Sequence, residues 1–78
     1  MNLRSELTEV VASVIHEAWM SWSQELARKE PISPARVSRW KTQWKPYRQL
    51  TDDSKERYRA WARRALGRIR QLSEELEA

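Results

Sequence analysis

The residues that could carry catalysis are few. His16 is the only histidine of the chain, cysteine is absent, and the only glycine is Gly67, which excludes a glycine-rich phosphate loop. The pair His16–Glu17 resembles the start of a zinc-protease His-Glu-x-x-His motif, but Met20 stands where the second histidine would be. We therefore expect no catalytic activity, no metal site and no cofactor. We interpret His16 as a partly buried helix histidine with a local hydrogen bond.

Aromatic and basic side chains alternate through the middle of the chain. A base can stack on such rings while neighbouring cations pair with its phosphate. The interleaved residues are Trp19, Trp22, Trp40, Trp44 and Tyr47 with Arg36, Arg39, Lys41, Lys45 and Arg48. Each ring could instead fill the core, because aromatic residues dominate small cores. Three short helices have little interior for all five tryptophans, so we expect one or two to line a surface groove.

The net charge of +4 conceals a strong asymmetry along the chain. Residues 1–27 hold one basic and four acidic residues, residues 28–70 hold fourteen basic and four acidic, and residues 71–78 hold three acidic. The middle of the chain is therefore basic and favours an anionic partner, such as nucleic acid, a nucleotide phosphate or an acidic protein surface. The alternative is that these cations only solvate helix faces.

A long amphipathic helix is predicted over residues 5–28. Apolar residues there recur three and four positions apart, the spacing of one helix face. They are Leu3, Leu7, Val10, Val11, Val14, Ile15, Ala18, Trp19, Trp22 and Leu26. Acidic residues near its start and basic residues near its end suit the helix dipole.

A second, short helix is predicted over residues 34–44. Ser33–Pro34 supplies an N-cap followed by proline at the first helical position, where a missing N–H has no cost. Trp40 and Trp44 lie four residues apart and should project from one face of this helix. Pro46 ends it, and residues 45–50 are predicted to be a short extended link.

The last predicted helix covers residues 52–76 and follows Thr51 as N-cap. Gly67 lies inside it and predicts a kink or a close helix contact. The helix carries a heptad-like apolar seam, whose members are Tyr58, Ala62, Ala65, Ile69, Leu72 and Leu76. The end of this seam, Leu72 and Leu76, has no evident partner within the chain except the start of the first helix, so residues 67–78 are predicted to mediate homo-oligomerisation.

With 78 residues, the chain is long enough for one small core only. We predict a single all-α domain over residues 1–78 with its core at about 5–66: two long antiparallel helices with a short third helix between them. Neither a stretch of about 20 apolar residues nor a signal-peptide pattern is present, which favours a cytoplasmic protein that does not enter membranes.

Three segments resemble the motifs of RyR domains, the repeats named from ryanodine receptors that also occur in bacteria and phages. Val14–Trp19 resembles the apolar-His-x-x-Trp motif of the family, and Pro46–Leu50 resembles its Pro-Tyr-x-x-Leu motif. Lys55, Arg59 and Ala62 resemble its Lys-x-x-x-Arg-x-x-Ala motif. Two features depart from the family pattern: a tyrosine precedes the arginine in place of aspartate, and the Gly-Trp-x-Tyr-Gly hairpin is missing.

The resemblance implies a pocket lined by His16, Trp19 and the Pro46–Tyr47 link, in which adenine-type nucleotides or related small molecules bind. Bacterial members of the family are associated with nucleotide second messengers in antiviral defence. It further implies a phage-encoded sponge that sequesters a cyclic oligonucleotide or ADP-ribose derivative. Together with the aromatic and basic pattern, the expected ligand-binding residues are His16, Trp19, Arg39, Trp40, Trp44, Lys45, Tyr47, Arg48 and Arg59.

Two other functions fit the same sequence. The basic middle of the chain could bind nucleic acid, although the arginines of the last helix spread around the cylinder and form no single stripe. The chain could also be a small inhibitor that covers an acidic surface of a host protein. A steep salt dependence of binding would indicate the first, and capture of a protein partner the second.

Overall fold

The computed structural model describes residues 2–77, which form three α-helices, one 3-10 turn and no strand. The elements are α1 (Leu3–Lys29), α2 (Pro34–Lys41), η1 (Tyr47–Gln49) and α3 (Asp52–Glu77). The predicted all-α fold class with three helices is confirmed. The bounds of α1 and α3 lie within two residues of the predicted ones, because capping side chains and proline mark them clearly.

Helix α2 is shorter than predicted. Its start is as expected, since the Ser33 hydroxyl accepts a hydrogen bond from the Arg36 N–H at 3.2 Å. It ends at Lys41 because the following amides tighten into i→i+3 bonds, from Gln43 to the Trp40 carbonyl at 2.8 Å and from Trp44 to the Lys41 carbonyl at 3.2 Å. Trp44 therefore lies beyond the helix and does not share a helical face with Trp40.

Residues 45–50, the link before α3, were predicted to be extended, but part of this link forms a turn. Gln49 N–H donates to the Pro46 carbonyl at 2.9 Å and Leu50 N–H donates to the Tyr47 carbonyl at 3.0 Å, which forms η1. This turn places the Leu50 side chain in the core, where it is 5% exposed.

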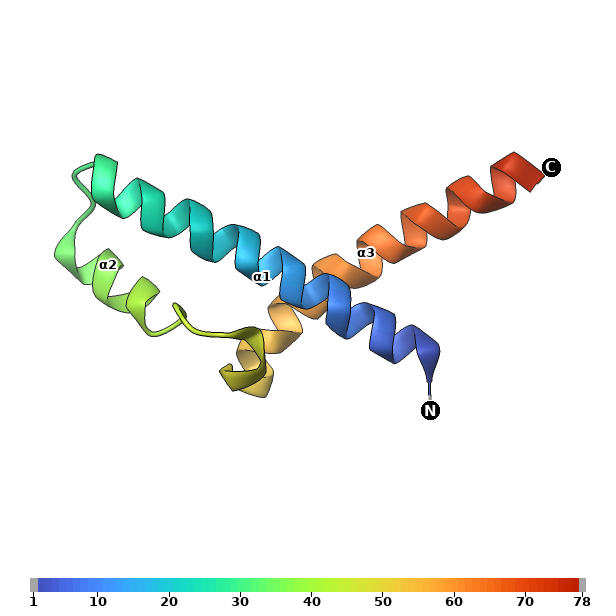
Figure 1. Ribbon diagram of the computed structural model, residues 1–78, viewed down its shortest axis with the longest axis horizontal. Coiled ribbons are helices and arrows are strands. Elements are labelled where there is room, and N and C mark those ends of the chain that lie inside the picture. Colours follow the sequence, from blue (N-terminus) through green and yellow to red (C-terminus); the bar gives the residue numbers. More distant parts are fainter. Residues whose placement is uncertain (1, 78) are drawn as a thin grey trace.

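Helices α1 and α3 cross near the middle of the molecule and diverge on both sides of the crossing (Figure 1). Helix α2 returns from the end of α1, and the link containing η1 leads back to the start of α3. The second half of α3 extends away from the rest of the chain. The radius of gyration of 15.6 Å exceeds the roughly 11.5 Å of a compact chain of this length, so the molecule is elongated.

The core at the crossing is small. Its buried apolar residues are Ala12, Leu50 and Ala62, and the two alanines let α1 and α3 approach closely. The predicted close contact at Gly67 is wrong, because a Cβ atom there would meet nothing within 4 Å. No helix within residues 2–77 combines the length and the apolar character needed to cross a membrane.

Candidate ligand-binding surface

His16 is a fully buried core residue and not an exposed binding group. Its Nε2 lies 2.8 Å from the carbonyl oxygen of Lys45, 29 residues further along the chain, so the expected local bond is absent. Because a carbonyl only accepts, Nε2 carries the proton and Nδ1 has no hydrogen-bond partner within residues 2–77. The ring packs edge-on against Tyr58 at 4.9 Å and stacks on Trp19 at 6.0 Å. His16 thus joins α1 to the link before η1.

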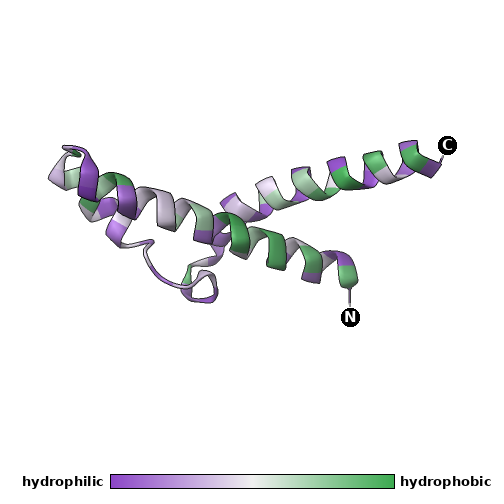
Figure 2. Ribbon diagram, turned by 45° about the horizontal axis from the view of Figure 1, so that its top comes forward, coloured by the Kyte–Doolittle hydropathy of each residue, from purple (hydrophilic) through white to green (hydrophobic). Residues whose placement is uncertain are grey.

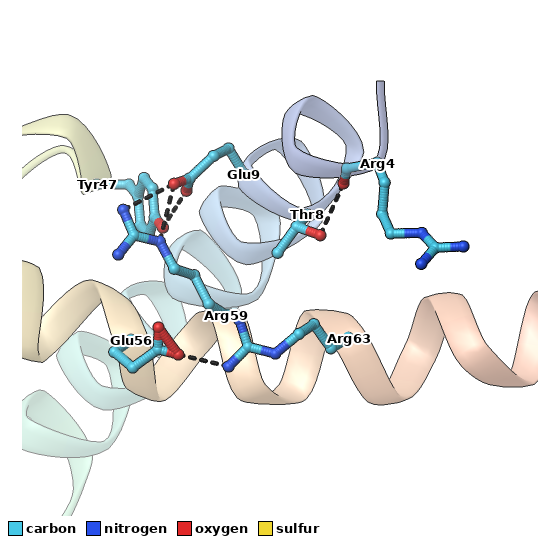
Figure 3. A network of polar contacts seen from close by, with 7 residues as sticks. All are labelled: Arg4, Thr8, Glu9, Tyr47, Glu56, Arg59 and Arg63. Atoms are coloured by element: carbon cyan, nitrogen blue, oxygen red, sulfur yellow. Dashed lines mark hydrogen bonds and ion pairs between the residues drawn. The ribbon is translucent and has the colours of Figure 1, made fainter. Parts of the chain in front are cut away.

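Glu9 of α1 is bonded to both α3 and η1. Arg59 of α3 donates to Glu9 Oε1 from Nη2 at 2.7 Å and from Nε at 2.8 Å, and the Tyr47 hydroxyl donates to the same carboxylate (Figure 3). The Arg59 hydrogen bonds lower the pKa of Glu9, and partial burial opposes them. Burial and the bond to Glu9 raise the pKa of Tyr47 to about 12. Tyr47 and Arg59, both predicted ligand-binding residues, therefore already have internal partners.

Four tryptophan rings line one side of α1 and α2. Trp44 Nε1 donates to Ser23 Oγ of α1 at 2.9 Å, which holds the segment after α2 against α1. Trp40 packs edge-on against Trp19 at 6.2 Å and lies tilted by 49° against Trp22 at 6.0 Å. Trp22 is the outermost ring and is 57% exposed. The Trp22–Trp40 pair therefore offers an aromatic surface to solvent.

Residues 31–51 form a segment that we name the basic arm. It contains no acidic residue, and its five cations are Arg36, Arg39, Lys41, Lys45 and Arg48. The ion pairs between residues 2–77 involve other cations, so none of the five has a carboxylate partner within 4.0 Å. All except Lys45 are exposed, and Lys45 is half-buried. The positive charge of the arm is consequently not neutralised by the chain.

The nine predicted residues thus fall into two groups. The first group has rings or head groups engaged in internal contacts; it consists of His16, Trp19, Trp44, Tyr47 and Arg59. The second group consists of Arg39, Lys45 and Arg48, whose head groups have no carboxylate partner among residues 2–77, and of Trp40, which packs against Trp19 and the exposed Trp22. Trp44 also lines a hollow of about 520 Å³ between α1 and α2, together with Lys41 and Arg28.

Sequence reasoning missed the residue that organises the first group. Glu9 is one of several acidic residues on α1, and its partners Tyr47 and Arg59 are 38 and 50 residues away, so no local pattern marks it. Within residues 2–77 no three potential metal-binding side chains lie together. No protein-family model, curated protein or solved structure matches the chain.

Proposed function

We propose that this chain is a non-catalytic binding module for a small phosphate-bearing nucleotide. In this proposal the base stacks on the exposed Trp22–Trp40 pair and the phosphates bind cations of the basic arm. The observation that carries it is the combination of an exposed aromatic surface with an adjoining segment of five cations that have no carboxylate partner among residues 2–77.

Phosphate binding should cost less free energy at the basic arm than at His16 or Arg59. Stacking of a base on an aromatic side chain contributes about 1–3 kcal/mol, and an unpaired cation can bind phosphate without first losing an ion pair. Arg59 would have to release Glu9 in order to reach a ligand, and His16 is wholly enclosed. We therefore assign direct contact to Trp22, Trp40 and the arm, and a positioning role to His16, Tyr47 and Arg59.

The resemblance to RyR domains suggests which class of nucleotide the chain would bind. A cyclic oligonucleotide or an ADP-ribose derivative presents both a base and phosphates, which is what the aromatic pair and the arm can recognise. A phage sponge would sequester such a signal by binding it.

Tryptophan fluorescence and thermal unfolding test the proposal directly. Cyclic dinucleotides, cyclic oligonucleotides and ADP-ribose derivatives would be titrated against the whole chain. A ligand at 100 times its dissociation constant should raise the free energy of unfolding by about 2.7 kcal/mol. If no member of the panel changes either signal, the proposal is wrong.

Matched variants locate the site. Trp22→Ala should weaken binding about tenfold or more, whereas Trp61→Ala should not, although the two rings are 57% and 58% exposed. Arg39→Gln should weaken binding, whereas Arg4→Gln removes the same charge at the start of α1, the end of that helix remote from α2 (Figure 1), and should not. Equal effects of both members of a pair would contradict the proposed location.

Nucleic acid is the second candidate because further exposed cations continue along α3. Arg57, Arg64 and Arg68 have no carboxylate partner within 4.0 Å among residues 2–77. Binding of a short oligonucleotide whose affinity falls steeply with salt would favour this function, since each neutralised phosphate releases counterions.

A further inference from the structure

The single chain exposes more surface than its size requires. Its accessible surface is 6281 Å², whereas a compact 9.4 kDa monomer exposes roughly 5,000 Å². The excess of roughly 1,300 Å² is larger than the ~800 Å² that each partner contributes to a standard stable interface. The elongated shape therefore leaves enough surface for a second chain.

Part of the exposed surface is an apolar seam that begins at the crossing and runs along the free half of α3. Trp61, Ile69, Leu72 and Leu76 are 58%, 58%, 55% and 78% exposed and lie with Ala65 on one side of the helix. Figure 2 shows apolar positions recurring along this free half. We name this set of five residues the α3 seam. Seams of this spacing pack against another helix. Within residues 2–77, α1 reaches the start of the α3 seam through Ile15, and no helix covers Leu72 and Leu76.

A hollow lies on the same side of α3 at its smallest seam residue. It has a volume of about 450 Å³ and is lined by Ile15, Trp61, Arg64, Ala65, Arg68 and Ile69. Ala65 is one of its lining residues, whereas Leu76, eleven residues further along the same seam, is 78% exposed. The α3 seam therefore carries a hollow at Ala65 and an exposed leucine, Leu76, that a second copy could place over it.

The charges along α3 match those of a second α3 helix only when the two helices run antiparallel. The last turn carries Glu74, Glu75 and Glu77 and no basic residue, which is unfavourable at the negative end of the helix dipole. Only Arg70 compensates, through a contact of 3.9 Å to Glu74. About two turns earlier, Arg64 and Arg68 border the hollow, and neither has a carboxylate partner in the described part of the chain.

We propose that the α3 seam binds a second copy of this chain as an antiparallel, two-fold symmetric helix pair. Ile69 of one copy packs against Leu72 of the other, which brings Leu76 into the hollow over Ala65 of its partner. In this register Glu75 of each copy approaches Arg68 of the other along the flank of the seam. A parallel pair would place the three glutamates of both copies together and leave the arginines without partners.

The first test is the association state of the whole chain. Sedimentation equilibrium should show dimers at micromolar concentration. Leu72→Glu should weaken the dimer more than a hundredfold, because the two-fold axis brings both new carboxylates together. Trp22→Glu introduces the same charge at an equally exposed apolar residue outside the seam and should leave the dimer intact.

A charge exchange tests the register without touching the core. Arg68→Glu and Glu75→Arg should each weaken the dimer by about tenfold, and the double variant should recover most of the loss because the charges of both symmetry-related pairs are exchanged. Both residues are exposed, so circular dichroism of the variants should match that of the native chain.

Helix direction has its own measurement, which the absence of native cysteine makes simple. A spin label at Ala60→Cys should lie about 30 Å from its copy in the antiparallel register, given a rise of 1.5 Å per residue. A much shorter separation would overturn the direction. A monomer at ~100 μM, a dimer indifferent to Leu72→Glu, or capture of the monomer by lipid vesicles would overturn the proposal. None of these readouts depends on nucleotide binding.

Discussion

The two halves of α3 carry the same amphipathic pattern but have different surroundings. In the first half, Ala62 is fully buried against α1, and Arg59 is bonded to Glu9. In the second half, Ile69 and Leu76 occupy the heptad position of Ala62, and they are 58% and 78% exposed. The difference arises because α1 and α3 diverge after their crossing (Figure 1). Periodicity thus indicates which face of a helix is apolar, whereas chain geometry decides whether the same chain covers it.

The largest expected effect comes from overfilling the crossing. Ala62→Leu should lower the free energy of unfolding by about 3 kcal/mol, because Ala62 is 0% exposed and the added carbons have no space. Ala60→Leu makes the same change at an exposed position of α3 and should alter stability by less than about 0.5 kcal/mol. Urea unfolding of the two variants measures the contrast, and similar losses would mean that the crossing is not the core.

A smaller loss should follow when the link between α1 and α3 is cut. Arg59→Ala should cost about 1–2 kcal/mol, since it leaves the Glu9 carboxylate with one fewer charged donor in a partly buried place. Arg63→Ala also removes an ion pair, to Glu56, but both of those side chains are more than half exposed and the loss should be near zero. Thermal unfolding of both variants compares them, and a larger loss for Arg63→Ala would refute the assignment.

The sequence predicted the helices because their ends depend on neighbouring residues. The Ser33 cap and the prolines mark boundaries locally, and the apolar spacing marks the faces. The end of α2 was predicted three residues too late because its last turn tightens into i→i+3 bonds, and no residue type in this segment predicts that change. The contact of His16 with the Lys45 carbonyl was missed because it depends on how the link folds back onto α1.

The sequence predicted which residue types form the candidate binding surface, but not which of them are exposed. Trp40, Arg39 and Arg48 stood out by type and spacing, and the structure leaves the two arginines exposed. Tyr47 and Arg59 stood out for the same reason, yet both are held by Glu9. Residue type cannot separate these groups, because the difference lies in whether a carboxylate distant in sequence reaches them.

The Tyr47 hydroxyl should make the free energy of unfolding depend on pH. Its pKa is raised from 10.0 to about 12, so above pH 10 the unfolded chain releases this proton while the folded chain keeps it. Stability should therefore fall as the pH rises from 10 to 12. Tyr47→Phe should cost about 1 kcal/mol at neutral pH and should flatten this alkaline decline. Urea midpoints across the window test it, and an unchanged slope in the variant would show that another group is responsible.

The smallest effect should be a gain, and it lies in the exposed half of α3. Gly67→Ala adds a Cβ atom where nothing lies within 4 Å, so the variant should stabilise the helix by roughly 0.5–1 kcal/mol through its higher helix propensity. Heptad spacing places Gly67 on the side of α3 opposite the α3 seam, so the dimer constant should not change. Unfolding and sedimentation of one variant therefore separate helix stability from association. A weaker dimer would mean that the second copy approaches α3 from the glycine side, and the register centred between Ile69 and Leu72 would then be wrong.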